Sequence, residues 1–125
     1  MMRLTKEQIH RMHTLLCQRT GGCDGLRDEG LLESAIYGIE QGFMGEALYK
    51  TPLEKGARLG FSLVKNHAFI DANKRIGVLA MLMYFRLYGI SLPLTNDDIT
   101  YIGLSLASGE MGYEELVRYL RARKS

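Results

Sequence analysis

The chain has 125 residues, a length that fits one domain with one buried core and is too short for two. Hydrophobic residues make up 46% of it and charged residues 24%, which excludes a disordered or fibrous chain. Sixteen Lys and Arg against fourteen Asp and Glu leave a net charge of +2, which argues against direct binding of nucleic acid. We therefore predict a single domain over residues 1–125.

The N-terminal residues carry no sign of export. The stretch from Met1 to Lys6 turns polar at once and lacks the apolar segment of a secretion signal. The longest apolar run, from Val78 to Phe85, is far shorter than the roughly 20 residues that span a bilayer. We expect a soluble, cytoplasmic protein without a membrane partner.

Three segments begin with the signature of a helix N-terminus, a side-chain oxygen followed three residues later by an acid or amide. These pairs are Thr5 with Gln8, Thr51 with Glu54, and Thr95 with Asp98. Pro52 strengthens the second start, because the first helical position does not use its N–H. Helices are therefore predicted directly after these three threonines.

Apolar residues recur at helical spacing in five segments. The stripes are Ile9, Met12 and Leu16; Leu31, Leu32, Ala35, Ile36 and Ile39; Leu53, Ala57, Gly60, Phe61 and Val64 within about 52–66; Ile99, Ile102 and Leu106; and Tyr113, Leu116, Val117 and Leu120. Residues 42–50 contain Gly42 and Gly45 and are predicted to form a loop or a short extended flap.

A sixth helical segment, at about 73–88, is apolar almost all round, which is typical of a helix at the centre of a bundle. Gly89 is expected to end this helix, and Pro93 helps to keep the following residues out of a helix. The predicted fold class is an all-α bundle of about six helices around this buried central helix, with the active-site loop at its N-terminus.

Two cysteines, Cys17 and Cys23, occur without an export signal, which favours reduced thiols over a disulfide. His10, His13 and Cys17 lie at helical spacing, so a zinc site of these three residues and Cys23 is an alternative. Closed structural zinc sites normally show tighter pairs of Cys or His. The sequence favours a helix with one buried thiol and one buried imidazole.

Polar residues concentrate where the 52–66 helix leads into the 73–88 helix, namely His67, Asp71, Asn73, Lys74 and Arg75. A helix N-terminus offers unpaired N–H groups and the positive end of the helix dipole, and so binds anions such as phosphate. Cations in the first turn oppose that dipole and cost stability unless an anion is present. Lys74 and Arg75 are therefore predicted to be phosphate ligands.

The neighbouring side chains complete the set that a phosphate-transfer site needs. Asp71 offers a hard carboxylate for Mg²⁺, and His67 can accept a proton near neutral pH. Phe69 and Ile70 are predicted to anchor the loop in the core. Each polar residue also has a structural explanation, as a helix end, an N-cap, a turn former or a solvated pair. Their coincidence at one junction favours a transferase site.

The string from His67 to Arg75, His-Ala-Phe-Ile-Asp-Ala-Asn-Lys-Arg, resembles the motif of the Doc type in the Fic/Doc superfamily. Residues 21–22, 25–35 and 63–66 resemble further family segments, so that the likeness covers roughly residues 4 to 120. It implies that His67 is the catalytic base and that Asp71 binds Mg²⁺. It further implies that Asn73, Lys74 and Arg75 contact the phosphates of ATP.

The chain departs from the broader Fic pattern at four positions. Ala68 replaces a proline, Ala72 and Lys74 replace two glycines, and Val78 replaces the last arginine. Loss of both glycines should reshape the phosphate-binding backbone, and Lys74 adds a point charge there. The resemblance to the Doc type then implies transfer of the γ-phosphate of ATP to a Ser or Thr hydroxyl of a protein, with elongation factor Tu as the family target, and inhibition of translation.

No internal inhibitory motif of the Fic kind is present, so the resemblance implies control by a Phd-like antitoxin whose C-terminal segment folds onto the toxin. Two alternatives stay open. One is nucleotidyl transfer from ATP or UTP to a protein hydroxyl on the same scaffold. The other is a catalytically quiet binding module, against which the intact His67 and Asp71 argue.

Overall fold

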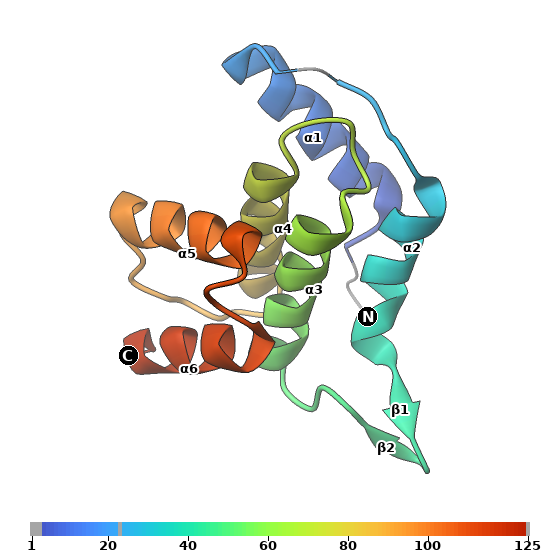
Figure 1. Ribbon diagram of the computed structural model, residues 1–125. Helices are drawn as coiled ribbons and strands as arrows, with labels where there is room; N and C mark the ends of the chain where they lie inside the picture. Colours follow the sequence, from blue (N-terminus) through green and yellow to red (C-terminus); the bar gives the residue numbers. More distant parts are fainter. Residues whose placement is uncertain (1–3, 23, 125) are drawn as a thin grey trace.

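The computed structural model describes residues 4–22 and 24–124. Within these ranges the chain forms six α-helices, α1 (Lys6–Thr20), α2 (Glu29–Tyr37), α3 (Pro52–Asn66), α4 (Asn73–Leu87), α5 (Asn96–Ser108) and α6 (Tyr113–Arg123), a 3-10 turn, η1 (Gly38–Glu40), and two short strands, β1 (Gly42–Phe43) and β2 (Glu46–Ala47) (Figure 1). The all-α prediction is confirmed. None of the helices in the described ranges is long and apolar enough to cross a membrane.

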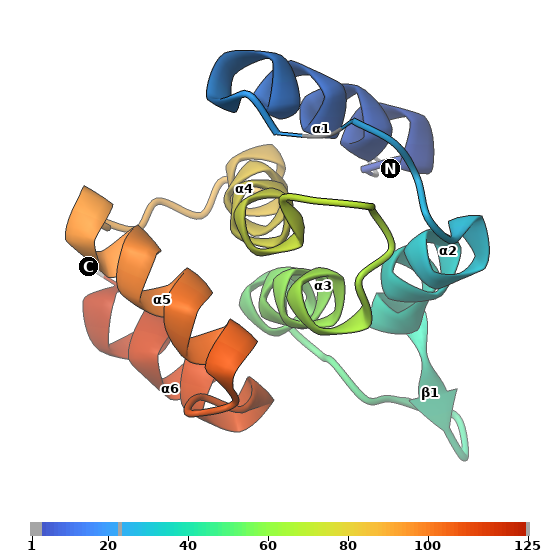
Figure 2. The same cartoon turned by 45° about the horizontal axis from the view of Figure 1, so that its top comes forward.

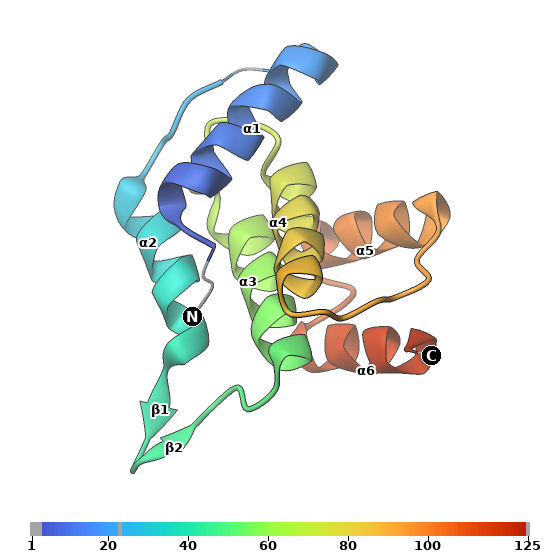
Figure 3. The same cartoon turned by 180° about the vertical axis from the view of Figure 1, so that it is seen from behind.

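Helices α3 and α4 lie together in the middle of the molecule, with α1 and α2 on one side and α5 and α6 on the other (Figure 2). The view from behind shows the same three layers (Figure 3). Helix α3 contacts α2, η1, α4, α5 and α6, whereas α4 contacts α1, α3 and α5. The helix predicted to be central, α4, therefore shares the centre of the bundle with α3. One face of α4 also borders an open groove.

Small residues allow α3 and α4 to approach closely. A Cβ added at Gly77 would lie 2.5 Å from Val64 Cγ2 and 3.0 Å from the carbonyl oxygen of Gly60, and one added at Gly60 would lie 2.9 Å from Met81 Cβ. Glycine at both positions lets the two backbones pack against each other without an intervening side chain. This contact fixes the direction in which α4 leaves the motif loop.

Gly77→Ala is therefore expected to lower the free energy of unfolding by about 1–3 kcal/mol, the usual cost of overpacking a well-packed core. The matched control is Gly38→Ala, because Gly38 has a right-handed helical φ of −59° and open space around an added Cβ. Urea unfolding followed by circular dichroism measures both variants. Equal stability of Gly77→Ala and the wild type would show that the helices can separate at no cost.

All three predicted helix starts are present. At α1 and α5 the pairs Thr5 with Gln8 and Thr95 with Asp98 form complete capping boxes. At α3 the Thr51 hydroxyl accepts from the N–H of Glu54 at 3.2 Å, but the Glu54 carboxylate accepts from that hydroxyl at 3.0 Å instead of from the Thr51 backbone. Helix α2 begins at a cap that the sequence interpretation missed, the carboxylate of Asp28, which accepts from the N–H of Leu31 at 3.1 Å.

The N-terminus of α5 gives one stability expectation with a defined pH dependence. The backbone N–H of Thr95, together with the hydroxyl of Tyr119, lowers the pKa of Asp98 from 3.8 to about 2. Because the folded pKa lies below the unfolded one, the stabilisation is present above about pH 4 and is lost as the pH falls toward 2. Asp98→Asn is expected to lower the Tm near neutral pH, with a difference from the wild type that shrinks over this acidic range. A difference independent of pH would contradict this linkage.

The buried face of α1 differs from the predicted stripe. Ile9, His13 and Cys17 are buried, whereas Met12 and Leu16 are only partly buried. The prediction of one buried imidazole and one buried thiol on this helix is thus confirmed. The predicted stripe of Ile9, Met12 and Leu16 also faces the core, with Met12 and Leu16 packed against it at the edge. His13 is buried because its ring stacks on that of Phe69, with a centroid distance of 3.9 Å. Cys23 lies outside the described residues.

Residues 42–50 form an antiparallel hairpin, the extended alternative of the prediction, with Gly42 opposite Ala47 and Phe43 opposite Glu46. Its turn places Met44 at a φ of 53° and Gly45 at 83°. The hairpin precedes the N-terminus of α3, while the motif loop follows its C-terminus (Figure 1). Helix α3 has 15 residues, and at 1.5 Å per residue it separates the two by about 20 Å. The hairpin therefore does not border the motif loop.

Candidate active site

The motif loop begins with a sharp turn at the end of α3, where His67 adopts a left-handed conformation with a φ of 54°. The side chain of Arg27, in the segment before α2, supports this turn through two hydrogen bonds. Its Nε donates to the His67 carbonyl at 2.6 Å and its Nη2 donates to the Asn66 carbonyl at 3.2 Å. The amide of Asn66 adds a bond from its Nδ2 to the Leu31 carbonyl at 2.9 Å. The backbone of His67 is thus held while its side chain is exposed.

The middle of the loop pairs with the segment before α2. Phe69 and Leu26 form an antiparallel bridge, and the Ala68 carbonyl accepts from the N–H groups of Arg27 and Asp28 at 2.8 and 3.0 Å. The Phe69 side chain is 1% exposed. Ile70, predicted as a second anchor, is 59% exposed, which corrects that prediction. Successive side chains of an extended segment point to opposite faces, so only one of the two reaches the core.

Asn73 closes the loop with its side-chain amide. Its Oδ1 accepts from the N–H of Phe69 at 3.0 Å and its Nδ2 donates to the carbonyl of Phe69 at 2.9 Å, and the residue is 8% exposed. The same Nδ2 lies 3.5 Å from His67 Nδ1. The amide is therefore occupied by the loop backbone, and the group of Asn73 that is left for a ligand at this helix end is its main-chain N–H.

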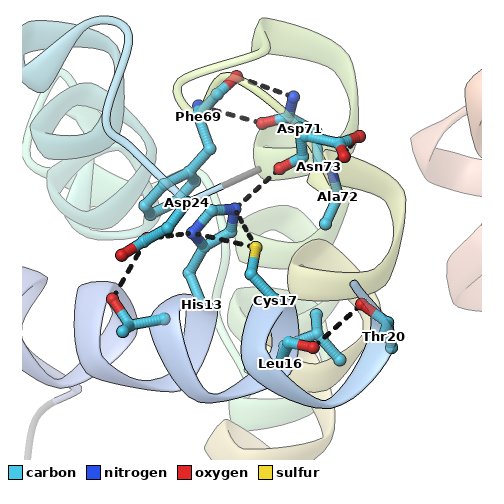
Figure 4. A network of polar contacts seen from close by, with 10 residues as sticks. His13, Leu16, Cys17, Thr20, Asp24, Phe69, Asp71, Ala72 and Asn73 are labelled. Carbon is cyan, nitrogen blue, oxygen red and sulfur yellow. Dashed lines mark hydrogen bonds and ion pairs between the residues drawn. The ribbon is translucent and has the colours of Figure 1, made fainter. Parts of the chain in front are cut away.

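Asp71 presents its carboxylate to solvent, where Oδ1 accepts from the N–H of Ala72 at 2.8 Å. Its carbonyl accepts from His13 Nε2 at 2.6 Å (Figure 4). The backbone of Gly22 comes so close that a Cβ there would lie 3.0 Å from Asp71 Oδ2. The main chain of Asp71 is thus fixed by α1, and its exposed carboxylate is of the type that binds a hard cation.

Helix α4 begins without a side-chain cap, because its N-cap is Ala72, which has a left-handed φ of 63°. The N–H of Ile76 is the first to donate within the helix, to the Ala72 carbonyl, so the N–H groups of Asn73, Lys74 and Arg75 have no acceptor inside α4. The other end of α4 carries Arg86, the sign of charge that the dipole favours. The first turn carries Lys74 and Arg75, the opposite sign. Uncapped N–H groups and adverse cations therefore lie together at one helix end, an arrangement that favours an anion.

Lys74 and Arg75 are exposed, and within residues 4–22 and 24–124 neither makes an ion pair with an acidic side chain. The aliphatic stem of Lys74 packs beside Gly103 of α5, since a Cβ there would lie 3.1 Å from Lys74 Cγ. A hollow of about 350 Å³ joins both cations to the rest of the motif; it is lined by Val64, His67, Ile70, Asp71, Ala72, Asn73, Lys74, Arg75 and Ala107. The site residues predicted from the sequence thus share one hollow, except Phe69, which lies beneath it.

A second, more apolar groove of about 440 Å³ borders the same two cations. Helices α1, α4 and α5 form it, and its lining residues are Leu16, Lys74, Arg75, Val78, Leu79, Leu82, Ile99, Thr100, Gly103 and Leu104. The partly buried apolar residues of α4 that line this groove, Leu79 and Leu82, account for part of its apolar surface that no other helix covers.

Residues missed as parts of the site are those that hold the loop from a distance, namely His13, Arg27 and Asn66. Arg27 and Asn66 lie in residues 25–35 and 63–66, two segments that resemble the family, and this resemblance could have pointed to them. For His13 the only signal was the predicted buried imidazole on this helix, which the sequence did not assign to His10 or His13.

Fold and site together define a helical scaffold with a polar motif loop at the uncapped N-terminus of α4, and residues 3–85 match the Fic/DOC family. The chain belongs to this family. It is 26% identical to "Protein kinase doc" of Escherichia phage P1 over 121 residues, which cover 97% of this chain and 94% of that relative. It is 35% identical to "Toxin Doc" of Mycolicibacterium smegmatis over 77 residues, which cover 62% of this chain and 59% of that relative. The resemblance to the Doc type is thereby confirmed.

Proposed function

We propose that this protein is a toxin that transfers the γ-phosphate of ATP, in the presence of Mg²⁺, to a Ser or Thr hydroxyl of a target protein. The observation that carries the proposal is the convergence of an exposed imidazole, an exposed carboxylate and an uncapped, cationic helix end on one hollow. These are the base, the metal ligand and the phosphate cradle that phosphoryl transfer requires.

Each group has a distinct task in this reaction. His67 takes the proton of the target hydroxyl as its oxygen bonds to the γ-phosphorus, and the bond from that phosphorus to the bridging oxygen breaks, so that ADP leaves. The N–H groups of Asn73, Lys74 and Arg75 and the side chains of Lys74 and Arg75 hold the phosphates. Bound Mg²⁺ would neutralise the charge that develops on the phosphate oxygens. Asp71 fits this ion because its carboxylate is exposed and its backbone is fixed.

Two replacements support phosphoryl over nucleotidyl transfer. Ala72 carries a side chain at the left-handed position where the broader Fic pattern has glycine, and Lys74 adds a flexible cation in the first turn of α4. A phosphoryl transfer releases ADP, whereas a nucleotidyl transfer releases pyrophosphate. We expect ADP to form in step with modified protein when the purified chain is mixed with ATP, Mg²⁺ and a bacterial lysate. Release of pyrophosphate, instead of ADP, in an amount equal to the modified protein would contradict this proposal and favour the nucleotidyltransferase alternative.

We further propose that the target is a translation factor such as elongation factor Tu and that a Phd-like antitoxin controls the protein. The apolar groove between α1, α4 and α5 supports such a partner. Its floor fits the apolar face of a folding C-terminal segment, and Lys74 and Arg75 at its rim favour acidic side chains. An antitoxin bound there would also shield the cations that hold the phosphates.

The toxin proposal has a simple cellular test. Induction of the wild-type chain in a bacterial host is expected to stop protein synthesis and growth, whereas the His67→Ala variant, expressed to the same level, should permit both. Amino-acid incorporation and optical density measure the two effects. Equal growth of both cultures would remove the toxin assignment.

A further inference from the structure

A second cluster of ligand-type side chains lies beneath the motif loop, outside the hollow described above. His13 and Cys17 come from adjacent turns of α1, and Asp24 follows the end of that helix (Figure 4). His13 Nδ1 is 3.4 Å from Asp24 Oδ1 and 3.8 Å from Cys17 Sγ. One donor atom from each residue lies within 4.8 Å of the other two.

The hydrogen bonds around His13 decide which ring nitrogen faces the cluster as an acceptor. Nε2 lies 2.6 Å from the Asp71 carbonyl, which can only accept, so Nε2 carries the proton. In the neutral ring Nδ1 then holds the lone pair. A histidine that binds a metal through one nitrogen while donating from the other to a carbonyl is the usual arrangement in protein metal sites. Asp24 is oriented in the same way, because its Oδ1 accepts from Thr14 Oγ1 at 3.2 Å.

We propose that His13 Nδ1, Cys17 Sγ and Asp24 Oδ1 bind a divalent transition-metal ion, with zinc as the expected ion. Imidazole nitrogen, thiolate sulfur and carboxylate oxygen are its three common protein ligands. Donors around a tetrahedral zinc lie roughly 3.3–3.8 Å apart, from bonds of about 2.0–2.3 Å. The distance of 3.4 Å from His13 Nδ1 to Asp24 Oδ1 lies within this range. Cys17 Sγ lies 3.6 Å from Nε2 and 3.8 Å from Nδ1, beside the ring, so its thiolate would turn toward Nδ1 when the ion binds.

The cluster is buried on one side and open to solvent on the other. His13 and Cys17 are buried, while the side chain of Asp24 is 48% exposed and opens the cluster to solvent. The Cys17 thiol gives its proton to solvent as it binds the ion. Cys23 lies outside the described residues, so its variant is included in the experiment below. The zinc set considered from the sequence is thus altered, with Asp24 in it and without His10.

An ion at this cluster would act on the motif loop through His13. A cation on Nδ1 polarises the imidazole and strengthens the bond from Nε2–H to the Asp71 carbonyl. The ion would therefore tie α1 to the residue whose carboxylate faces the phosphate site. Binding should raise the Tm of the full chain, since an ion that binds only the folded state stabilises it.

The experiment uses the full chain, freed of metal with a chelator and then titrated with zinc chloride in a calorimeter. We expect one zinc ion per chain and a higher Tm. Cobalt chloride should give the near-ultraviolet absorption of a thiolate bound to cobalt. Cys17→Ser should abolish this absorption, and Cys17→Ser and Asp24→Asn should each weaken zinc binding at least tenfold. Asp24 is exposed, so its variant tests the site even if Cys17→Ser does not fold.

Two variants control for other sites. His10→Asn lies on the same helix but outside the cluster, and Asp71→Asn removes the carboxylate of the phosphate site; both should bind zinc as the wild type does. Weaker binding by Cys23→Ser in addition to the cluster variants would add Cys23 to the ligand set. Absence of zinc binding, unchanged binding by Asp24→Asn, or loss in Asp71→Asn or Cys23→Ser without loss in the cluster variants would overturn the proposal.

Discussion

Replacing His67 by alanine is expected to lower the rate of phosphate transfer to the target protein by at least about 100-fold, the usual contribution of a positioned general base. The imidazole lines the same hollow as Asp71 and the first turn of α4, so it is placed to take the proton of an attacking hydroxyl. The initial rate of ADP release with saturating ATP and Mg²⁺ measures the loss.

The fold should tolerate this change, because the loop is held by the backbone of His67 and not by its ring. Its carbonyl accepts from Arg27, and its side chain is exposed. His67→Asn is the matched control, since asparagine accepts the left-handed φ of 54° more readily than alanine does. Both variants should keep the wild-type Tm and lose transfer together. Transfer at the wild-type rate in either folded variant would remove His67 from the role of base.

Asp71→Asn is expected to raise the Mg²⁺ concentration needed for half-maximal transfer by at least about tenfold, because an amide is a far weaker ligand for a hard cation than a carboxylate is. Asparagine keeps an oxygen that can accept from the N–H of Ala72, and the bond from His13 goes to the backbone of Asp71, so the start of α4 should be unchanged.

The control for this variant is Glu114→Gln, which removes an exposed carboxylate from α6, a helix that does not line the hollow. A titration of the transfer rate with Mg²⁺ should separate the two variants. The same Mg²⁺ dependence in Asp71→Asn and the wild type would show that another group holds the ion.

Helix positions could be predicted because their starts depend on residues three apart in the sequence. Thr5, Thr51 and Thr95 cap their helices through bonds within one turn. Which faces meet depends on residues far apart and could not be predicted. Hydrophobicity indicated the stripe of Ile9, Met12 and Leu16, which packs on the core, but it could not show that stacking on Phe69 buries His13. Likewise, the close approach at Gly60 and Gly77 makes α3, which looked like an ordinary amphipathic helix, the most widely contacted element.

The residues of the candidate site could be predicted because they are contiguous, so one junction between helices brings them together. Their individual orientations could not. The side chain of Asn73 turns back onto Phe69, and Ile70 points to solvent because the loop is extended there. The hydrogen bond from Arg27 to His67 joins residues 40 positions apart in the sequence, and the one from His13 to Asp71 joins residues 58 positions apart. Such contacts appear only once the chain has folded.

The central claim is that the γ-phosphate, and not the nucleotidyl group, moves to the target. The most direct measurement incubates the purified protein and a bacterial lysate with Mg²⁺ and ATP labelled at either the α- or the γ-phosphate, with the His67→Ala variant in parallel. We expect a labelled protein band with γ-labelled ATP alone, and none with the variant. A band labelled only from the α-phosphate would contradict the claim and make the protein a nucleotidyltransferase.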